Sequence, residues 1–368
     1  MGVATQAQAV RSGILGISFD TDESIAADGG KIYVNFIDAM VKQGHIATRS
    51  YSLNLNSLDS DKGTILFSAY DNSRCVDDLV LLDIQPNASG KYSEFSVIWS
   101  SLTLTYDGYS TAVDNPDDFP LPAILDSGTS LTLIPPALFE ELASYYGVVN
   151  SSDYGYLIDC SAVSAADTLD FEFGGANGIV INVPMSEMAL PQNDANGYPL
   201  TIDDDHTPAC TFGLYPSFPG SPILLGDTFL RSAYVVYDLD ALQIGICNAD
   251  WSDTRDSDYV TTATGGPQAP GAADKTISGS VLSASTAPRS SITGATTTLT
   301  DIVNHNATET GSGGHPGSTS ASGSGAAATT SHSGASTVAQ YPGLSTNKIA
   351  TYLSISLVTG VLVVGLLL

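Results

Sequence analysis

The sequence predicts an all-β fold, and three features support this prediction. Residues 123–135 form two apolar runs on either side of a turn at Asp126, Ser127 and Gly128, the pattern of two buried strands joined by a tight turn. Residues 169–173 and 179–184 have strand patterns on either side of paired glycines, as in a β-hairpin. Residues 51–55 alternate between polar and apolar side chains, as a half-buried strand does.

The remaining elements can be predicted in chain order. We expect an apolar strand at residues 12–19, a helix at residues 31–45, strands at residues 63–71 and 79–84, and a second helix at residues 136–147. Gly44 is the expected C-cap of the first helix. One side of that helix carries Ile32, Phe36, Ala39, Met40 and Ile46. The second helix is expected to bury Leu138, Phe139, Leu142 and Tyr146.

Asp126 is the candidate catalytic residue. It lies at the tip of the predicted strand-turn-strand, where Gly128 permits a tight turn and the hydroxyls of Ser127 and Thr129 can hydrogen-bond the carboxylate. Asp-Ser-Gly is also ordinary turn chemistry, so this tripeptide alone does not establish a site. The globular part of the chain has no H-E-x-x-H pair, no G-x-S-x-G elbow and no phosphate-binding loop. Carboxylate chemistry without metal or cofactor is the enzymatic hypothesis that remains.

Two later stretches, together with the flanks of Asp126, indicate a family. These stretches are Ile223-Leu224-Leu225-Gly226-Asp227-Thr228-Phe229-Leu230-Arg231 and Tyr234-Val235-Val236-Tyr237-Asp238-Leu239. With Asp126 they resemble the C-terminal lobe of pepsin-like aspartic proteases, and the chain as a whole is similar to the fungal, GPI-anchored, yapsin-type members. The resemblance implies a bilobal pepsin-like fold, with a complete C-terminal lobe and an incomplete N-terminal lobe.

The resemblance also implies roles for individual residues. Asp126 would be one of two catalytic carboxylates that activate water to hydrolyse peptide bonds of secreted or cell-surface proteins. Substrate would lie along Gly128, Thr129 and Ser130. Structural support of the loop would come from Ser127 and Gly226.

The second catalytic aspartate is not found in this sequence. In the family, an Asp-Thr-Gly-Ser loop precedes the strand that residues 13–16 resemble. Asp20-Thr21-Asp22 is superficially similar, but Asp22 replaces the glycine and the segment follows that strand. We therefore expect a chain that is truncated at its N-terminus and inactive as given. The alternative is a catalytically inactive module that binds peptides at the cell surface.

Composition and the resemblance together divide the chain into four regions. Residues 1–70 are expected to be the remnant of the N-terminal lobe with the inter-lobe sheet, and residues 71–262 the C-terminal catalytic lobe. Residues 263–348 are rich in Ser, Thr and Gly and predict a disordered stalk. Residues 349–368 are apolar and follow a polar spacer with small residues around Gly334, which predicts a GPI signal with attachment there. A plain membrane anchor is the alternative.

The net charge excludes some partners. The chain has 39 acidic and 12 basic residues, a formal net charge of -27, so binding to nucleic acid is not expected. No Lys or Arg occurs between Lys91 and Arg231, the interval that contains Asp126. A carboxyl among acidic neighbours keeps its proton to higher pH, which favours chemistry in an acidic medium.

Cysteines and glycosylation motifs favour an extracellular protein. The four cysteines include no C-x-x-C pair. The family resemblance pairs Cys160 with Cys210, whereas Cys75 and Cys247 stand outside family positions and can either pair or stay free. The N-x-[ST] motifs, which predict glycosylation, lie at Asn87, Asn150 and Asn306. We expect a monomer on the cell surface.

Overall fold

The computed structural model describes residues 15–22, 31–113, 119–175, 178–194, 196–203, 206–252 and 254–262. Within these ranges the chain consists mainly of β-strands, which confirms the predicted all-β class. The expected stalk and GPI signal lie outside the described residues. Short 3-10 helices are η1 (Asp20–Asp22), η2 (Asn72–Arg74), η4 (Cys160–Ala162) and η6 (Met185–Met188).

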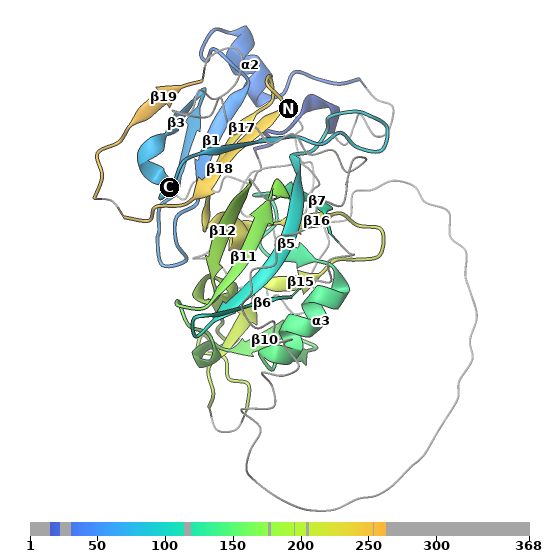
Figure 1. Cartoon of the computed structure of the whole chain (residues 1–368), viewed down its shortest axis with the longest axis vertical. Helices are drawn as coiled ribbons and strands as arrows, with labels where there is room; N and C mark the ends of the chain where they lie inside the picture. The colour runs from blue at the N-terminus through green and yellow to red at the C-terminus, as the bar shows by residue number, and fades with distance from the viewer. Residues whose placement is uncertain are drawn as a thin grey trace, which may run out of the picture.

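A five-stranded antiparallel sheet forms the upper part of the molecule (Figure 1). In spatial order its strands are β2 (Thr64–Phe67), β1 (Ser50–Asn54), β17 (Ala233–Asp238), β18 (Gln243–Asn248) and β4 (Val80–Asp83). The sheet joins segments that are far apart in sequence, since Tyr51 of β1 pairs with Tyr237 of β17. These two rings stack with centroids 4.7 Å apart and are almost completely buried.

An eight-stranded sheet lies below and carries the Asp126 loop, which we define as residues 126–131. Its strands, in spatial order, are β12 (Ile179–Pro184), β11 (Thr168–Phe173), β5 (Ser96–Tyr106), β7 (Leu121–Leu125), β16 (Ile223–Leu225), β8 (Thr132–Ile134) and β15 (Leu214–Pro216), while β6 (Tyr109–Ala112) pairs with β5 alone. β16 runs parallel to β7 and antiparallel to β8, so it separates the two strands that the loop connects.

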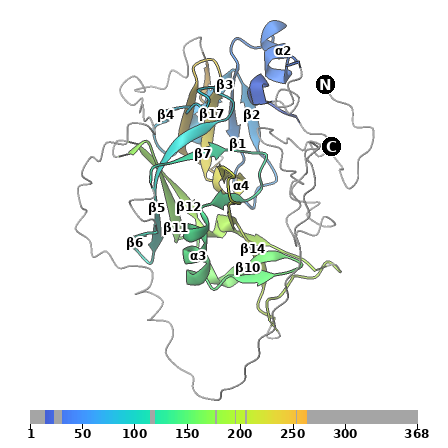
Figure 2. The same cartoon turned by 90° about the vertical axis from the view of Figure 1, so that its right-hand side faces the viewer.

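Two smaller sheets and three helices complete the described fold. The four-stranded sheet contains β13 (Ala189–Pro191), β14 (Ala209–Phe212), β10 (Gly155–Asp159) and β9 (Val149–Ser151). The two-stranded sheet pairs β19 (Tyr259–Thr261) with β3 (Ala69–Asp71). The α-helices are α2 (Phe36–Lys42), α3 (Pro136–Tyr145) and α4 (Asp227–Leu230). α3 packs beside the lower strands, and α4 lies between the upper sheet and the lower part of the molecule (Figure 2).

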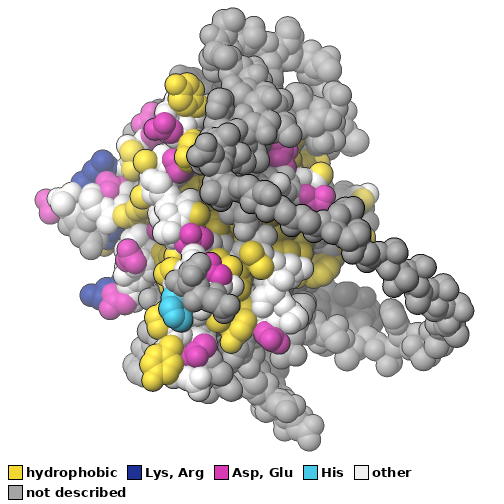
Figure 3. Space-filling model, turned by 90° about the horizontal axis from the view of Figure 1, so that it is seen from below, with side chains coloured by type: hydrophobic (Ala, Val, Ile, Leu, Met, Phe, Trp, Pro, Cys, Tyr) yellow, Lys and Arg dark blue, Asp and Glu magenta, His cyan; other side chains and the backbone are white. Residues whose placement is uncertain are grey.

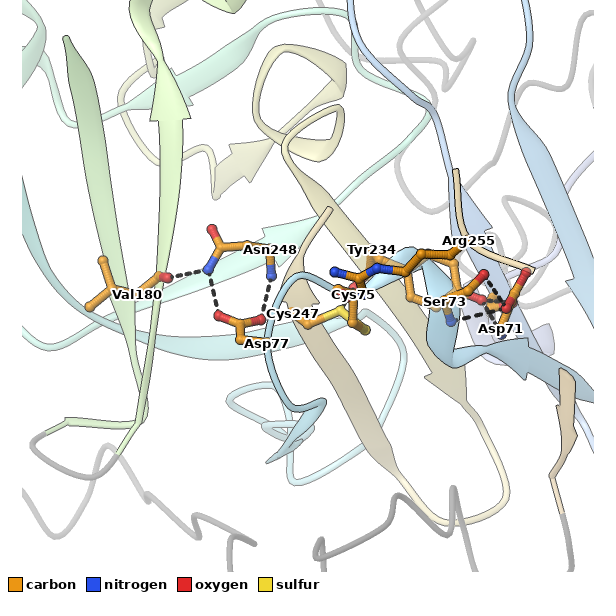
Figure 4. Close-up of a disulfide and its surroundings, with 10 residues drawn as sticks. Asp71, Ser73, Cys75, Asp77, Val180, Tyr234, Cys247, Asn248 and Arg255 are labelled. Carbon is orange, nitrogen blue, oxygen red and sulfur yellow. Dashed lines mark hydrogen bonds between the residues drawn. A yellow bond between two sulfur atoms is a disulfide. The ribbon is translucent and has the colours of Figure 1, made fainter. Parts of the chain in front are cut away.

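Residues 249–262, which we call the C-terminal strap, run back along the first strands of the chain. The amide of Asp258 donates to the Asp71 carboxylate at 2.8 Å, and Arg255 donates to the Cys75 carbonyl at 2.8 Å. A disulfide joins Cys75 to Cys247 beside these contacts (Figure 4). At the end of the strap, Thr262 is buried in a cluster of hydroxyl groups. Its partners there are Thr48, Ser50 and Ser68.

The structure corrects two of the predicted elements. The first helix is only α2, and it buries Ile37, whereas Ile32 and Phe36 are exposed. Its start is set by Asn35, whose side chain accepts from the Asp38 amide and donates to the Ser18 carbonyl. Residues 15–19 are buried in part and form no strand, and the Ser18 carbonyl accepts from the Asn35 side chain. Residues 12–14 of the predicted strand lie outside the described residues.

The second predicted helix agrees well with the structure. α3 covers Pro136–Tyr145 and the chain leaves it at Gly147, which has a φ of +64°. The four side chains that were expected to be buried are buried, namely Leu138, Phe139, Leu142 and Tyr146. The cystine of the four-stranded region joins Cys160 at the end of β10 to Cys210 on β14.

Candidate active site

Asp126 is held at the end of β7 by the backbone of β16. Its amide donates to the carbonyl of Leu225 at 3.1 Å, which continues the parallel pairing of the two strands by one residue. The residue is 8% exposed, so it is largely withdrawn from water.

Both carboxylate oxygens of Asp126 have fixed hydrogen-bond donors. The amide of Gly128 donates to Oδ1 at 2.9 Å, and the hydroxyl of Thr129 donates to Oδ2 at 2.6 Å. We expected Ser127 to contribute as well, but the hydrogen bonds to this carboxylate come from Gly128 and Thr129. The Asp126 loop therefore sets the orientation of the carboxylate through one backbone and one side-chain donor.

Gly226 is required where α4 passes behind the loop. A Cβ atom on Gly226 would lie 2.3 Å from the carbonyl oxygens of Thr129 and Leu131, closer than a carbon and an oxygen can approach. Beyond the glycine, the amide of Asp227 donates to the Thr129 carbonyl at 2.8 Å and that of Thr228 to the Ser130 carbonyl at 3.2 Å. The absence of a side chain thus allows α4 to bind the loop from behind.

Burial is the main influence on the acidity of Asp126. It raises the pKa of this carboxyl, while the hydrogen bonds from Thr129 and Gly128 lower it by a smaller amount. The pKa of Asp227 is raised well above its usual value, chiefly by burial and further by the charge of Asp126, against the lowering effect of Arg231. The site therefore favours a protonated carboxyl to higher pH than an exposed aspartate would.

The surroundings of the site supply little positive charge. Arg231 is the first basic residue after Lys91. Figure 3 shows acidic side chains scattered over the lower end of the molecule, with Lys and Arg only at one edge of that view. For Asp227 the Arg231 charge opposes the effect of burial and the Asp126 charge adds to it, whereas burial alone raises the pKa of Asp126.

The structure brings together all the loop residues that the sequence singled out. Ser127, Gly128, Thr129 and Ser130 follow Asp126 in one turn, Thr129 is fully buried, and Ser130 is partly exposed. Within the described ranges, no other carboxyl hydrogen-bonds Asp126. Asp20 is not among the residues that hydrogen-bond Asp126, and its charge raises the pKa of Asp38 of α2.

Sequence reasoning missed the polar contacts that anchor α4. Glu187 of η6 accepts from Arg231, which follows α4, at 2.7 Å, and both residues are nearly buried. No local pattern relates these residues, because 44 positions separate them along the chain.

The described residues contain no group of three or more His, Cys, Asp or Glu side chains that could hold a metal ion. None of the helices in those ranges is both long and apolar enough to span a bilayer.

Comparisons with known proteins agree with the geometry around Asp126. The family model described as "Eukaryotic aspartyl protease" matches residues 1–249. The "Probable aspartic-type endopeptidase opsB" of Aspergillus oryzae is 35% identical over 266 residues, which are 71% of this chain and 51% of that protein. "Aspartic proteinase 3" and "Barrierpepsin" of Saccharomyces cerevisiae are each 32% identical over 68% of this chain, and the match covers 43% and 41% of their lengths.

A solved aspartic proteinase from Irpex lacteus is 19% identical, with a TM-score of 0.46 over 61% of this chain and 64% of that one. The chain spans about half the length of the curated relatives it matches. Because the family model covers more than half of the chain and includes the Asp126 loop, the chain belongs to the eukaryotic aspartyl protease family.

Proposed function

We propose that this chain is the Asp126-bearing part of an aspartic endopeptidase that hydrolyses peptide bonds of secreted or cell-surface proteins. The observation that supports this proposal best is the carboxylate of the buried residue Asp126, which is held on both oxygens by the loop that follows it. The loop holds this carboxylate in one fixed orientation, as a general base requires in order to accept a proton.

The reaction needs two carboxyl groups that share one proton. The ionised one takes a proton from water, which then attacks the peptide carbonyl, while the protonated one donates to the carbonyl oxygen. Asp126 provides one of the two. Asp227 is an unsuitable second member, because its backbone binds the rear of the loop and its Oδ1 is shielded from solvent.

We propose that the second carboxylate comes from the part of the family's fold that this chain does not span. The chain covers 51% of the A. oryzae relative, and a two-lobed enzyme needs one aspartate from each lobe. By itself the chain is then inactive. Substrate would extend along the loop at Gly128, Thr129 and Ser130. Ser127 and Gly226 would support the loop.

Reconstitution would test this proposal. The chain is expressed alone and together with the N-terminal half of a relative, and cleavage of a fluorogenic peptide library is measured at acidic pH. We expect cleavage only from the combined protein, and none after Asp126→Asn, which keeps the shape of the side chain and removes the carboxylate. Cleavage that survives D126N would remove Asp126 from the mechanism. Stable peptide binding without any cleavage would favour the peptide-binding module instead.

We also propose a monomer at the cell surface, held by a GPI anchor attached at Gly334 and glycosylated at Asn87, Asn150 and Asn306. Asn87 and Asn150 are exposed, which glycosylation requires. The side-chain nitrogen of Asn87 donates to Ser93 at 3.1 Å, and a glycan on this nitrogen would leave one N–H for that bond. Gly334 and Asn306 lie outside the described residues. Release of the protein from intact cells by a phosphatidylinositol-specific phospholipase would support the anchor, and retention would contradict it.

A further inference from the structure

The helix behind the Asp126 loop cannot be stable by itself. α4 contains only four residues, and a single helical turn costs more conformational entropy than its hydrogen bonds return. Its first two residues hold the loop through the amides of Asp227 and Thr228, which donate to the carbonyls of Thr129 and Ser130. Thr228 is also held by Thr132 and by the Gly213 carbonyl, so the far end of α4 is one of the contacts on which the placement of the loop depends.

That other end is held by a nearly buried ion pair. Arg231, the C-cap of α4, donates from Nε to Oε2 of Glu187 at 2.7 Å and from a terminal nitrogen to the Glu187 carbonyl at 2.6 Å. The side chains of Arg231 and Glu187 are 11% and 7% exposed. The carbonyl of Arg231 also accepts from the indole of Trp251 at 2.8 Å, so the residue is fixed on both its side chain and its backbone.

Glu187 extends the contact to the upper sheet. Its carboxylate also accepts from the backbone amide of Leu58, at 2.9 Å to one oxygen and 3.2 Å to the other. Leu58 lies in the connection between β1 and β2, so this carboxylate joins the five-stranded sheet, η6 and α4. Figure 2 shows α4 in this position between the upper sheet and the lower part of the molecule.

From this geometry we infer that Glu187 is a positioning residue for the Asp126 loop, acting through Arg231 and α4. Every donor that faces its carboxylate, the Arg231 guanidinium and the Leu58 amide, requires an acceptor. A glutamine oxygen in the place of Oε2 could still accept from both, but it carries no charge, so Arg231 loses its counter-charge. The amide nitrogen of glutamine would replace Oε1 and would face the Leu58 amide, which now donates to Oε1 at 3.2 Å. Only the catalytic consequence rests on the proposed peptidase function.

Hydrogen exchange in Glu187→Gln tests the inference without any activity measurement. The amides of Asp227 and Thr228 should exchange about tenfold faster or more than in the unmodified chain, because the helix that holds them opens more often. Amides of β17 should keep their rates. In the reconstituted peptidase the same variant should lose kcat with little change in KM, because substrate contacts remain and only the placement of Asp126 changes.

Glu172→Gln is the matched control. Glu172 also has a carboxylate that accepts a hydrogen bond, from the neutral Ser101 hydroxyl at 2.6 Å, but it lies on β11 and has no bond to α4. E172Q should leave the Asp227 and Thr228 amides unchanged. The inference is overturned if E187Q leaves both amides at their original rates, or if E172Q accelerates them equally.

Glu187→Asp covers the case in which E187Q does not fold. This variant keeps the charge but is one methylene shorter, so it cannot span both Arg231 and Leu58. It should accelerate the same two amides by a smaller factor, and unchanged rates in E187D would overturn the inference. Loss of peptidase activity with normal exchange would instead count against the positioning role while leaving the peptidase proposal intact.

Discussion

The hydrogen bond from Thr129 to Asp126 should make the stability of this protein depend on pH in a defined way. Thr129→Val replaces a fully buried hydroxyl with a methyl group of the same shape and removes the 2.6 Å bond to Oδ2. A hydrogen bond to a charged group contributes about 1.5–3 kcal/mol, and one between neutral groups about 1 kcal/mol. The variant should therefore lose more stability when Asp126 is ionised than when it is protonated.

The direction follows from the pKa of Asp126. Burial already raises this pKa, and the Thr129 hydroxyl opposes the rise. A carboxyl whose pKa is raised by folding gives stability that is complete below its unfolded pKa and is lost as the pH rises through its folded pKa. Removing the hydroxyl raises the folded pKa further, so the loss continues to higher pH and becomes larger.

Urea denaturation followed by tryptophan fluorescence measures this effect, since Trp99 is fully buried. We expect T129V to lower the free energy of unfolding by about 1 kcal/mol near pH 3 and by about 1.5–3 kcal/mol near pH 7. Thr132→Val is the matched control, because it removes an equally buried hydroxyl that bonds Thr228 at 2.9 Å and no carboxylate. T132V should lower the free energy of unfolding by the same amount near pH 3 and near pH 7. An equal cost for T129V at acidic and neutral pH would refute the reasoning.

Three further predictions concern the scaffold. Ser68 has a φ of +54°, a strained conformation for a residue with a side chain. Ser68→Gly should therefore be about 1 kcal/mol more stable than Ser68→Ala, although both variants lose the same hydroxyl contacts. Urea midpoints in the opposite order would contradict the strain. Gly226→Ala should destabilise the protein by about 3 kcal/mol or more, because its Cβ would meet two carbonyl oxygens at 2.3 Å, and a variant with an unchanged thermal midpoint would disprove the close approach. Replacing Cys75 and Cys247 by alanine removes a cross-link between residues 172 positions apart, and chain entropy predicts that the free energy of unfolding falls by about 5 kcal/mol. For the other disulfide, which spans 50 positions, the same calculation gives about 4 kcal/mol. A smaller loss for the Cys75–Cys247 variant than for the other would count against the chain-entropy account.

Much of the fold could be predicted because the relevant signals are local. The β7-turn-β8 unit was evident from apolar runs around Asp126, and α3 from its proline, its glycine and four apolar side chains at helical spacing. The first helix was overextended because Ile32 fits a helical face by spacing alone. The actual start of the helix is set by Asn35. The side-chain amide of Asn35 donates to the Ser18 carbonyl, and the periodicity of the sequence does not reveal such a contact.

The candidate site divides in the same way. The sequence by itself determined which carboxylate to consider and the turn that presents it, because Asp126, Gly128 and Thr129 are neighbours and a turn of this kind folds on its own contacts. Tertiary contacts place this turn in the molecule, because the Asp126 amide donates to Leu225 of β16 and the carbonyls of Thr129 and Ser130 accept from α4.

The family resemblance implied that Gly226 supports the loop, but only the tertiary structure decided what anchors α4 behind it. Glu187 and Arg231, which form that anchor, are 44 positions apart, and Cys75 pairs with Cys247 across 172 positions. Hydrogen bonds, ion pairs and disulfides form only between groups that are close in space. Residues that are distant in sequence come close only when the strands have paired into sheets. The sequence therefore determined the chemistry that is available to this protein, and the packing of the sheets decided which groups meet.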